Sequence, residues 1–302
     1  MGAITEGAVS GSLFLQSVVL GILLGGLYAL LAAGLTLYFG VMRVVMVAHS
    51  AFLILAAYLA WWFRERTGWD PLLSMVVTVP AFFLLGVAMQ RLLLARLRPA
   101  TLTTMSVLLT FAIAMIIEGL LGSTWSGTQR RIRLPYSSSS FEVFGANIAV
   151  VKLIAFGLAA VSMLGLYGLM KYTRFGQALR ATIQHPDAAR LVGIDTGRIA
   201  GYGFGLGLAT AAVGGTALAL DATFYPSLHW HWIGPLMAII VVGGLGSIPG
   251  AAIAAMVLGL AQSLLQIELG TTWAQTVFYA ALFVTLMIRP QGFFGGRLAQ
   301  RF

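Results

Sequence analysis

Long apolar runs alternate with short polar connections along almost the whole chain. Most runs have about 20 residues, the length that a helix needs to cross a hydrocarbon core of ~30 Å. We therefore predict an all-α integral membrane protein, a polytopic bundle of about eight to ten transmembrane helices, some of them short or broken. The apolar segments cover residues 12–40, 44–63, 71–90, 101–121, 148–170, 198–221, 232–248, 250–268 and 272–289.

Composition agrees with this pattern and leaves no room for a soluble domain. Hydrophobic residues make up 59% of the 302 and charged residues 9%, with a mean hydropathy of +0.93. Soluble proteins are roughly a quarter charged. We expect a single transmembrane domain over residues 1–302. Small residues four apart predict close helix contacts, as in membrane bundles; they are Gly203, Gly207, Ala211 and Gly215, Ala251, Ala255 and Gly259, and Gly21 and Gly25.

The net charge of +9 indicates orientation rather than nucleic-acid binding, because the basic residues lie between apolar runs and not in one patch. Short connections rich in Lys and Arg mark the cytoplasmic side. We expect a cytoplasmic loop at about 171–197 and an extracytoplasmic loop at about 122–147, although three arginines in the latter strain this rule. The predicted cytoplasmic cations are Arg91, Arg96, Arg98, Lys171, Arg174, Arg180, Arg190, Arg198, Arg289, Arg297 and Arg301.

The stretch VVGGLGSIPG, residues 241–250, has the glycines of a phosphate-binding loop without its other parts. A Walker A loop needs Gly-Lys-Ser/Thr, whereas the chain has only Lys152 and Lys171, each after an apolar residue. Pro249 stands where a dinucleotide fingerprint has its third glycine. We therefore predict a break in a membrane helix, with Gly243 to Gly250 in the bundle interior beside the cytoplasmic half of a path. The alternative is a tight turn between two helices at the inner surface.

Candidate chemistry is sparse. There is no cysteine, and His229 and His231 in HWHW have no nearby acid, so an aromatic belt is favoured over a metal site. Ion-coupled transporters usually keep acids inside their spans. Here only Glu118, Asp221 and Glu268 touch apolar runs, all toward span ends. We expect no catalytic residue, no metal and no cofactor bound by this chain.

The cytoplasmic loop is built for surface helices. Phe175, Leu179 and Ile183 recur every four residues in an amphipathic pattern. A second short helix is predicted to begin at Pro186 and to end at Gly193. Two such helices would form a rigid surface to which a soluble partner could bind.

Several segments of the chain resemble known permeases. DAARLVG, residues 187–193, resembles the E-A-A-x-x-x-G motif of bacterial ABC importer permeases, with Asp replacing Glu, although Gly203 stands where that motif continues. YALLAAGLTLYFGVMRVVMVAHSAF, VVGGLGSIPGAAIAAMVLGLAQS and IRPQGFFG resemble LivH-type permeases for branched-chain amino acids, from about Gly25 to Gly295. Residues 46–50 read MVAHS, where such permeases commonly have N-F-A-H-G, which puts the usual solute in doubt.

The resemblance implies a permease subunit of a binding-protein-dependent importer in a bacterial inner membrane. Its partners would be a LivM-like permease or a second copy, two cytoplasmic ATPases that hold ATP and Mg, and a periplasmic or lipid-anchored solute-binding protein. The predicted ATPase-coupling residues are Arg180, Pro186, Asp187, Ala188, Ala189, Arg190 and Gly193. The predicted path residues are His49, Ser50, Gly243, Gly244, Gly246, Ser247, Pro249 and Gly250.

The sequence leaves open the energy source of transport, the role of His49 and the identity of the solute. The chain could be an ion-driven transporter or facilitator that acts without an ATPase. His49 could simply be hydrogen-bonded to a carbonyl of a neighbouring helix. Similar permeases carry branched-chain amino acids, urea, amides or aromatic acids, so the sequence does not name the solute.

Overall fold

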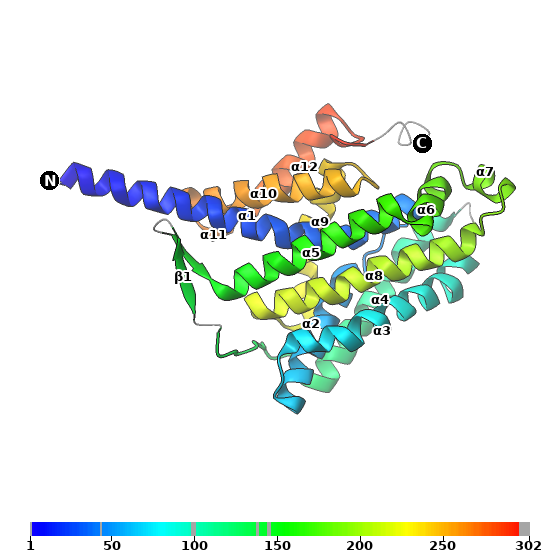
Figure 1. Ribbon diagram of the computed structural model, residues 1–302, viewed down its shortest axis with the longest axis horizontal. Coiled ribbons are helices and arrows are strands. Elements are labelled where there is room, and N and C mark those ends of the chain that lie inside the picture. The colour runs from blue at the N-terminus through cyan, green and yellow to red at the C-terminus, as the bar shows by residue number, and fades with distance from the viewer. Residues whose placement is uncertain (1, 43, 98–100, 137–138, 144–145, 296–302) are drawn as a thin grey trace.

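A computed structural model describes residues 2–42, 44–97, 101–136, 139–143 and 146–295 and is almost entirely helical (Figure 1). The main helices are α1 (Gly2–Met42), α2 (His49–Thr67), α3 (Met75–Leu92), α4 (Leu102–Trp125), α5 (Val150–Tyr172), α6 (Arg174–Gln184), α7 (Pro186–Leu191), α8 (Thr196–Asp221), α9 (His229–Gly243), α10 (Ile248–Leu269), α11 (Thr271–Ala274) and α12 (Thr276–Ile288). Short 3₁₀ helices are η1 (Pro71–Ser74), η2 (Leu94–Arg96) and η4 (Pro226–Leu228), and the two strands are β1 (Ser140–Val143) and β2 (Ala146–Ala149).

The predicted all-α membrane bundle is confirmed. Seven helical segments of the described residues are long and apolar enough to cross a membrane: Leu13–Gly40, Pro71–Arg96, Leu102–Trp125, Val150–Tyr172, Thr196–Asp221, Ile248–Leu269 and Thr271–Ile288. The other two predicted segments form α2 and α9. α9 has 15 residues and so spans only about 22 Å. α9 is therefore one of the short helices that were predicted, whereas α2 has 19 residues.

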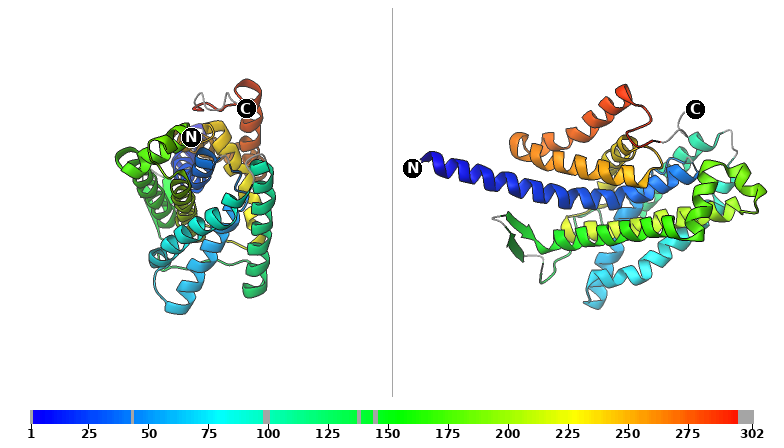
Figure 2. Two further views of the ribbon diagram at one scale, coloured as in Figure 1. Left: turned by 90° about the vertical axis from the view of Figure 1, so that its right-hand side faces the viewer. Right: turned by 45° about the horizontal axis from the view of Figure 1, so that its top comes forward.

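The helices α1, α2 and α8 form the centre of the bundle. Within the most apolar stretch of the α8 span, 89% of the residues are buried by protein. In the last span, which contains α12, the share is 17%. Small residues permit these contacts: a Cβ on Gly207 of α8 would lie 2.5 Å from Tyr38 Cε1, and one on Gly259 of α10 would lie 2.6 Å from Gly25 Cα of α1. The predicted close contacts at these glycines are therefore confirmed. An end-on view shows α12 at the edge of the bundle (Figure 2).

Charge is distributed unequally between the two ends. α6 and α7 lie at one end, at the right of Figure 1, and the β1–β2 hairpin lies at the other. In the described residues the first end has eight basic and two acidic residues, and the opposite end, Glu6 aside, has six of each. Arg98, Arg297 and Arg301 lie outside the described residues. This asymmetry supports the predicted cytoplasmic position of the α6–α7 end.

The connection at the opposite end contains paired backbone. β1 and β2 pair antiparallel, and Arg130 forms two backbone hydrogen bonds with Phe224, of 2.8 and 2.9 Å. The Tyr136 hydroxyl donates to Asp70 Oδ2 at 2.7 Å. Burial, and then this hydrogen bond, raises the pKa of Tyr136, so its hydroxyl stays protonated and donates.

Candidate functional site

The first helix of the basic end, α6, is fixed to the bundle along one face. Leu179 is fully buried, and the Thr173 hydroxyl caps the helix by accepting from the Gly176 amide at 3.1 Å. A Cβ on Gly176 would lie 2.3 Å from the Met170 carbonyl oxygen, so α6 crosses the end of α5 in direct backbone contact. The Arg180 guanidinium donates to the same carbonyl. The predicted amphipathic helix is confirmed, and Arg180, which was predicted for ATPase coupling, joins α6 to α5.

The second helix, α7, projects from this base. Asp187 is 95% exposed and lies 3.6 Å from Arg190, whereas Ala189 is buried. Gly193 has φ +82°, and its amide donates to the Arg190 carbonyl oxygen at 3.0 Å. The amide of Ile194 donates to the Ala189 carbonyl oxygen, also at 3.0 Å, which completes a glycine-terminated helix end. The predicted start at Pro186 and end at Gly193 are confirmed to within two residues.

Sequence reasoning missed the most exposed apolar residues of this segment. Leu191 is 90% exposed and Val192 is 76% exposed, side by side at the end of α7. Spacing alone would assign them to a core, but α7 is too short to have two buried faces and Ala189 already occupies the inner one. Adjacent exposed apolar residues of this kind are typical of surfaces that contact another protein or a membrane.

The stretch 241–250 forms a turn between two helices and not a break within one. α9 ends at Gly243 and α10 begins at Ile248, and Ser247 caps α10 by accepting from the Gly250 amide at 3.2 Å. The turn lies at the α6–α7 end, since Gly246 comes against Gly40 near the end of α1. The predicted interruption of a membrane helix was therefore wrong in form, and the alternative of a tight turn between two helices describes the structure.

The glycines of this turn are explained by contact with the segment RPQGFFG. The Phe293 amide donates to the Val242 carbonyl oxygen at 2.9 Å. A Cβ on Gly244, which has φ +95°, would lie 2.3 Å from the Gly295 nitrogen. A Cβ on Gly292, with φ +76°, would lie 2.3 Å from the Val241 carbonyl oxygen. Backbone therefore lies against backbone here, and these glycines serve close approach rather than phosphate binding.

A cavity of about 340 Å³ lies between α6 and the turn. Arg180 of α6 lines one part of it, and Gly246, Ser247 and Pro249 line another. Arg180 was predicted for ATPase coupling, whereas the three residues of the turn were predicted for the path. The structure places them in one site at the end of the bundle.

Comparison with known proteins gives the family. The model of the family described as "Branched-chain amino acid transport system / permease component" matches residues 17–287. The chain is 30% identical to the high-affinity branched-chain amino acid transport permease protein LivH of Escherichia coli K12, over 93% of this chain and 96% of that one. It is 27% identical to the probable LivH of Methanocaldococcus jannaschii, over 91% and 90%. It is 26% identical to BraD of Pseudomonas aeruginosa, over 93% and 96%. No solved structure matches significantly.

The chain belongs to this family of permeases. It is a multi-pass membrane protein and a permease component of the ABC transporter type, not the ATPase of such a system. The predicted resemblance to LivH-type permeases is thereby confirmed, over nearly the stretch from Gly25 to Gly295 that the motifs had indicated.

Two predicted path residues of the permease, His49 and Ser50, lie away from the turn, in the core. His49 is 1% exposed, and its Nε2 donates to the Leu31 carbonyl oxygen of α1 at 2.9 Å. Its ring meets Tyr38 edge to face, with centroids 5.6 Å apart. Ser50 is 2% exposed, and its hydroxyl is 3.4 Å from the Val47 carbonyl oxygen. The hydrogen bond to a neighbouring helix, one of the two alternatives for His49, is present.

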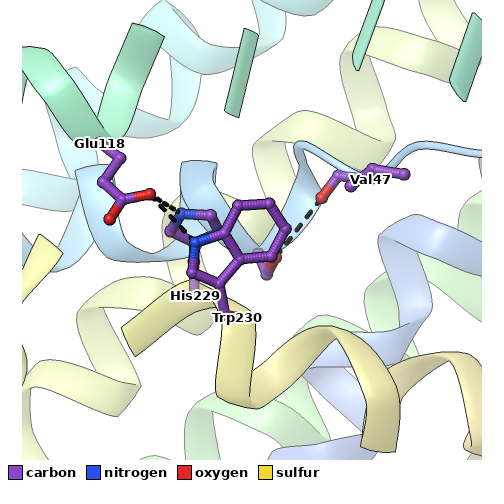
Figure 3. Close-up of polar contacts among 5 residues, drawn as sticks. Val47, Glu118, His229 and Trp230 are labelled. Carbon is purple, nitrogen blue, oxygen red and sulfur yellow. Dashed lines mark hydrogen bonds and ion pairs between the residues drawn. The ribbon is translucent and has the colours of Figure 1, made fainter. Parts of the chain in front are cut away.

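Two of the three acids near the spans of the permease, Glu118 and Asp221, have local partners. Glu118 Oε2 accepts from His229 Nε2 at 3.0 Å and from Trp230 Nε1 at 3.1 Å (Figure 3). Asp221 pairs with Lys152 at 2.9 Å. Each of these carboxylates thus joins helices to one another, which is a structural use of an intramembrane charge.

The two histidines of HWHW do not converge. His229 faces Glu118, whereas His231 accepts from the Gln275 amide at 2.5 Å. Among the described residues, no group of three or more His, Cys, Asp or Glu side chains is placed to hold a metal ion.

Proposed function

We propose that this permease forms the translocation path of a binding-protein-dependent ABC importer, driven by two cytoplasmic ATPase subunits that dock on α7. The observation that carries the proposal is the geometry of α7, a short helix tied back through Ala189 that presents Leu191 and Val192 to solvent. Two apolar side chains on a charged rim are suited to a groove in a soluble partner. The ATP and Mg²⁺ belong to the ATPases, and the chain itself binds no cofactor.

The attachment of α6 explains how movement of α7 would reach the bundle. Leu179 is buried in a cluster with Leu37 of α1 and Met170 of α5, and Arg180 bonds to the end of α5. When the ATPases close on ATP, a pull on α7 would therefore move α5 and α1 as one unit. Such rigid-body tipping is the simplest way for a packed bundle to alternate between inward-facing and outward-facing states.

The remaining partners and the path follow from the same proposal. A second permease, LivM-like or a copy of this chain, would complete the pathway in the bacterial inner membrane, and a periplasmic or lipid-anchored binding protein would deliver the solute. Branched-chain amino acids are the first candidates, since the related permeases are named for them. We place His49 and Ser50 on the wall of the path, and the turn from Gly243 to Gly250 at its cytoplasmic end.

A negative charge at Leu191 or Val192, the exposed apolar residues at the end of α7, tests the docking proposal. Leu191→Asp and Val192→Asp should each reduce co-purification of the ATPase at least tenfold, because a buried unpaired carboxylate costs more than about 1.4 kcal/mol. Phe141→Asp is the matched control: Phe141 is 59% exposed, on β1 at the opposite end. All three variants should reach the membrane in normal amounts. Normal recovery of the ATPase with Leu191→Asp would overturn the proposal.

Two residues of the DAARLVG motif, Asp187 and Gly193, give a second test of docking. Asp187→Lys should weaken ATPase recovery by reversing an exposed charge at the start of α7. Gly193→Val should weaken it by straining the left-handed backbone that ends the helix. Complexes of normal yield and normal transport with both variants would remove these residues from the coupling site.

A further inference from the structure

The cavity beside α6 has one apolar wall and one basic wall. It lies between the end of α1, the end of α5, α6 and the α9–α10 turn. Aliphatic side chains from four elements form the apolar wall, namely Leu37, Met170, Ile183 and Ile248. Lys171 and Arg180 also line it. The lining residues include no Asp or Glu.

Neither cation of this cavity has a carboxylate partner among the described residues. Lys171 Nζ is 3.2 Å from the Tyr167 hydroxyl and lies over the Tyr167 and Tyr172 rings, 5.3 Å from each centroid. Arg180 donates to a backbone carbonyl. The two acids of this end are committed elsewhere, Asp187 with Arg190 and Asp195 with Arg198. Two positive charges therefore face the cavity without compensation.

The cavity is also at the depth where lipid headgroups lie. Lys171 is the penultimate residue of the span Val150–Tyr172, and tyrosine rings flank it, as is usual at a membrane interface. This is the end with eight basic residues to two acidic ones, which the orientation rule assigns to the cytoplasmic leaflet. That leaflet is the one whose anionic lipids are attracted by basic pockets between helices.

We propose that this cavity binds one anionic phospholipid of the cytoplasmic leaflet. The phosphate lies between Lys171 and Arg180, and the acyl chain runs along Leu37 and Ile183. Because the cavity is shared by α6 and the α9–α10 turn, the bound lipid stabilises the contact of α6 with the bundle. The inference rests on the proposed function, which supplies the cytoplasmic orientation of this end and the role of α6 in coupling.

Lipid retention measured by native mass spectrometry of the full-length permease in detergent tests the site. Phosphatidylglycerol should be retained at a lower concentration than phosphatidylcholine with the same chains. Lys171→Gln should weaken its retention about fivefold, the effect of one cation near a charged lipid surface. Arg289→Gln is the matched control, since it removes one exposed cation at the same end, outside the cavity. It should leave the retention unchanged.

A steric variant separates the cavity from general charge attraction. Ile183→Trp fills the apolar wall and keeps both cations, so it should lower phosphatidylglycerol retention while the melting temperature shows that the chain is folded. Equal retention of the two lipids, or equal effects of Lys171→Gln and Arg289→Gln, would overturn the proposal. Displacement of the lipid by millimolar inorganic phosphate would overturn it in favour of a free-anion site. No ATPase is present in this assay, so its failure would leave the docking proposal standing.

Discussion

Gly244 illustrates how single residues of this permease are constrained by backbone and not by ligand. It has φ +95° and lies directly against the backbone of Gly295. The amide of Phe293 bonds to the Val242 carbonyl oxygen beside it. Both constraints were invisible in the sequence, because the partners are about 50 residues apart and a glycine-rich stretch fits many kinds of loop.

Alanine at position 244 should therefore destabilise the permease. The left-handed backbone alone costs an L-residue about 1 to 3 kcal/mol, and the added Cβ also meets the Gly295 nitrogen. We expect a lower melting temperature in detergent for Gly244→Ala. Gly157→Ala on α5 is the control, since nothing lies within 4 Å of its Cβ position. Equal melting temperatures would contradict the contact between the turn and RPQGFFG.

His49 is the residue for which a structural role and a transport role have to be separated. His49→Ala should lower the melting temperature, because it removes a buried donor to Leu31 and leaves a cavity. If His49 also lines the path, uptake per folded transporter should fall. Transport assayed in proteoliposomes, normalised to folded protein, decides this. Unchanged affinity and rate would remove His49 from the path.

At the scale of elements, hydropathy predicted where helices form better than where they end. The predicted segment 232–248 includes the turn, because Leu245 and Ile248 continue the apolar run although the helix stops at Gly243. Conversely, the amphipathic spacing of Leu179 and the Pro186 and Gly193 signals located α6 and α7 well, because these signals are local. What could not be predicted was tertiary: the exposure of Leu191, and the cavity that joins α6 to the turn.

The contact between α6 and α5 should be required for coupling. Gly176→Val places a side chain where a Cβ would already lie 2.3 Å from the Met170 carbonyl oxygen, so α6 must move away. We expect the complex to hydrolyse ATP but to transport at least tenfold less solute per ATP. Gly168→Val on α5 is the control, because its Cβ position is open. Full coupling with Gly176→Val would show that α6 does not transmit the movement.

The whole molecule has one strongly basic end, and this asymmetry fixes the expected orientation. The natural chain has no cysteine, so single substitutions report sidedness without background. Thr128→Cys, at the hairpin end, should react with a membrane-impermeant thiol reagent in intact cells, whereas Ala95→Cys, in η2 at the basic end, should react only in inverted vesicles. The reverse pattern would place α7 outside and exclude cytoplasmic ATPases as its partners.

The partners of the intramembrane acids also bear on the whole molecule. Glu118 and Asp221 are engaged with His229 and Lys152, respectively. Ion-coupled transporters usually keep intramembrane acids for moving ions or protons, whereas these two acids are held in contacts between helices. The described residues thus give the ATPase-driven proposal better support than the ion-driven alternative.

Uptake into proteoliposomes tests the central claim most directly. The permease pair, its two ATPases and the binding protein are reconstituted, and uptake of labelled leucine, isoleucine or valine is followed with and without ATP on the ATPase side. We predict uptake only when the ATPases, ATP and the binding protein are all present, and none by the permease chain alone. Solute uptake by the purified chain without any ATPase would contradict the account.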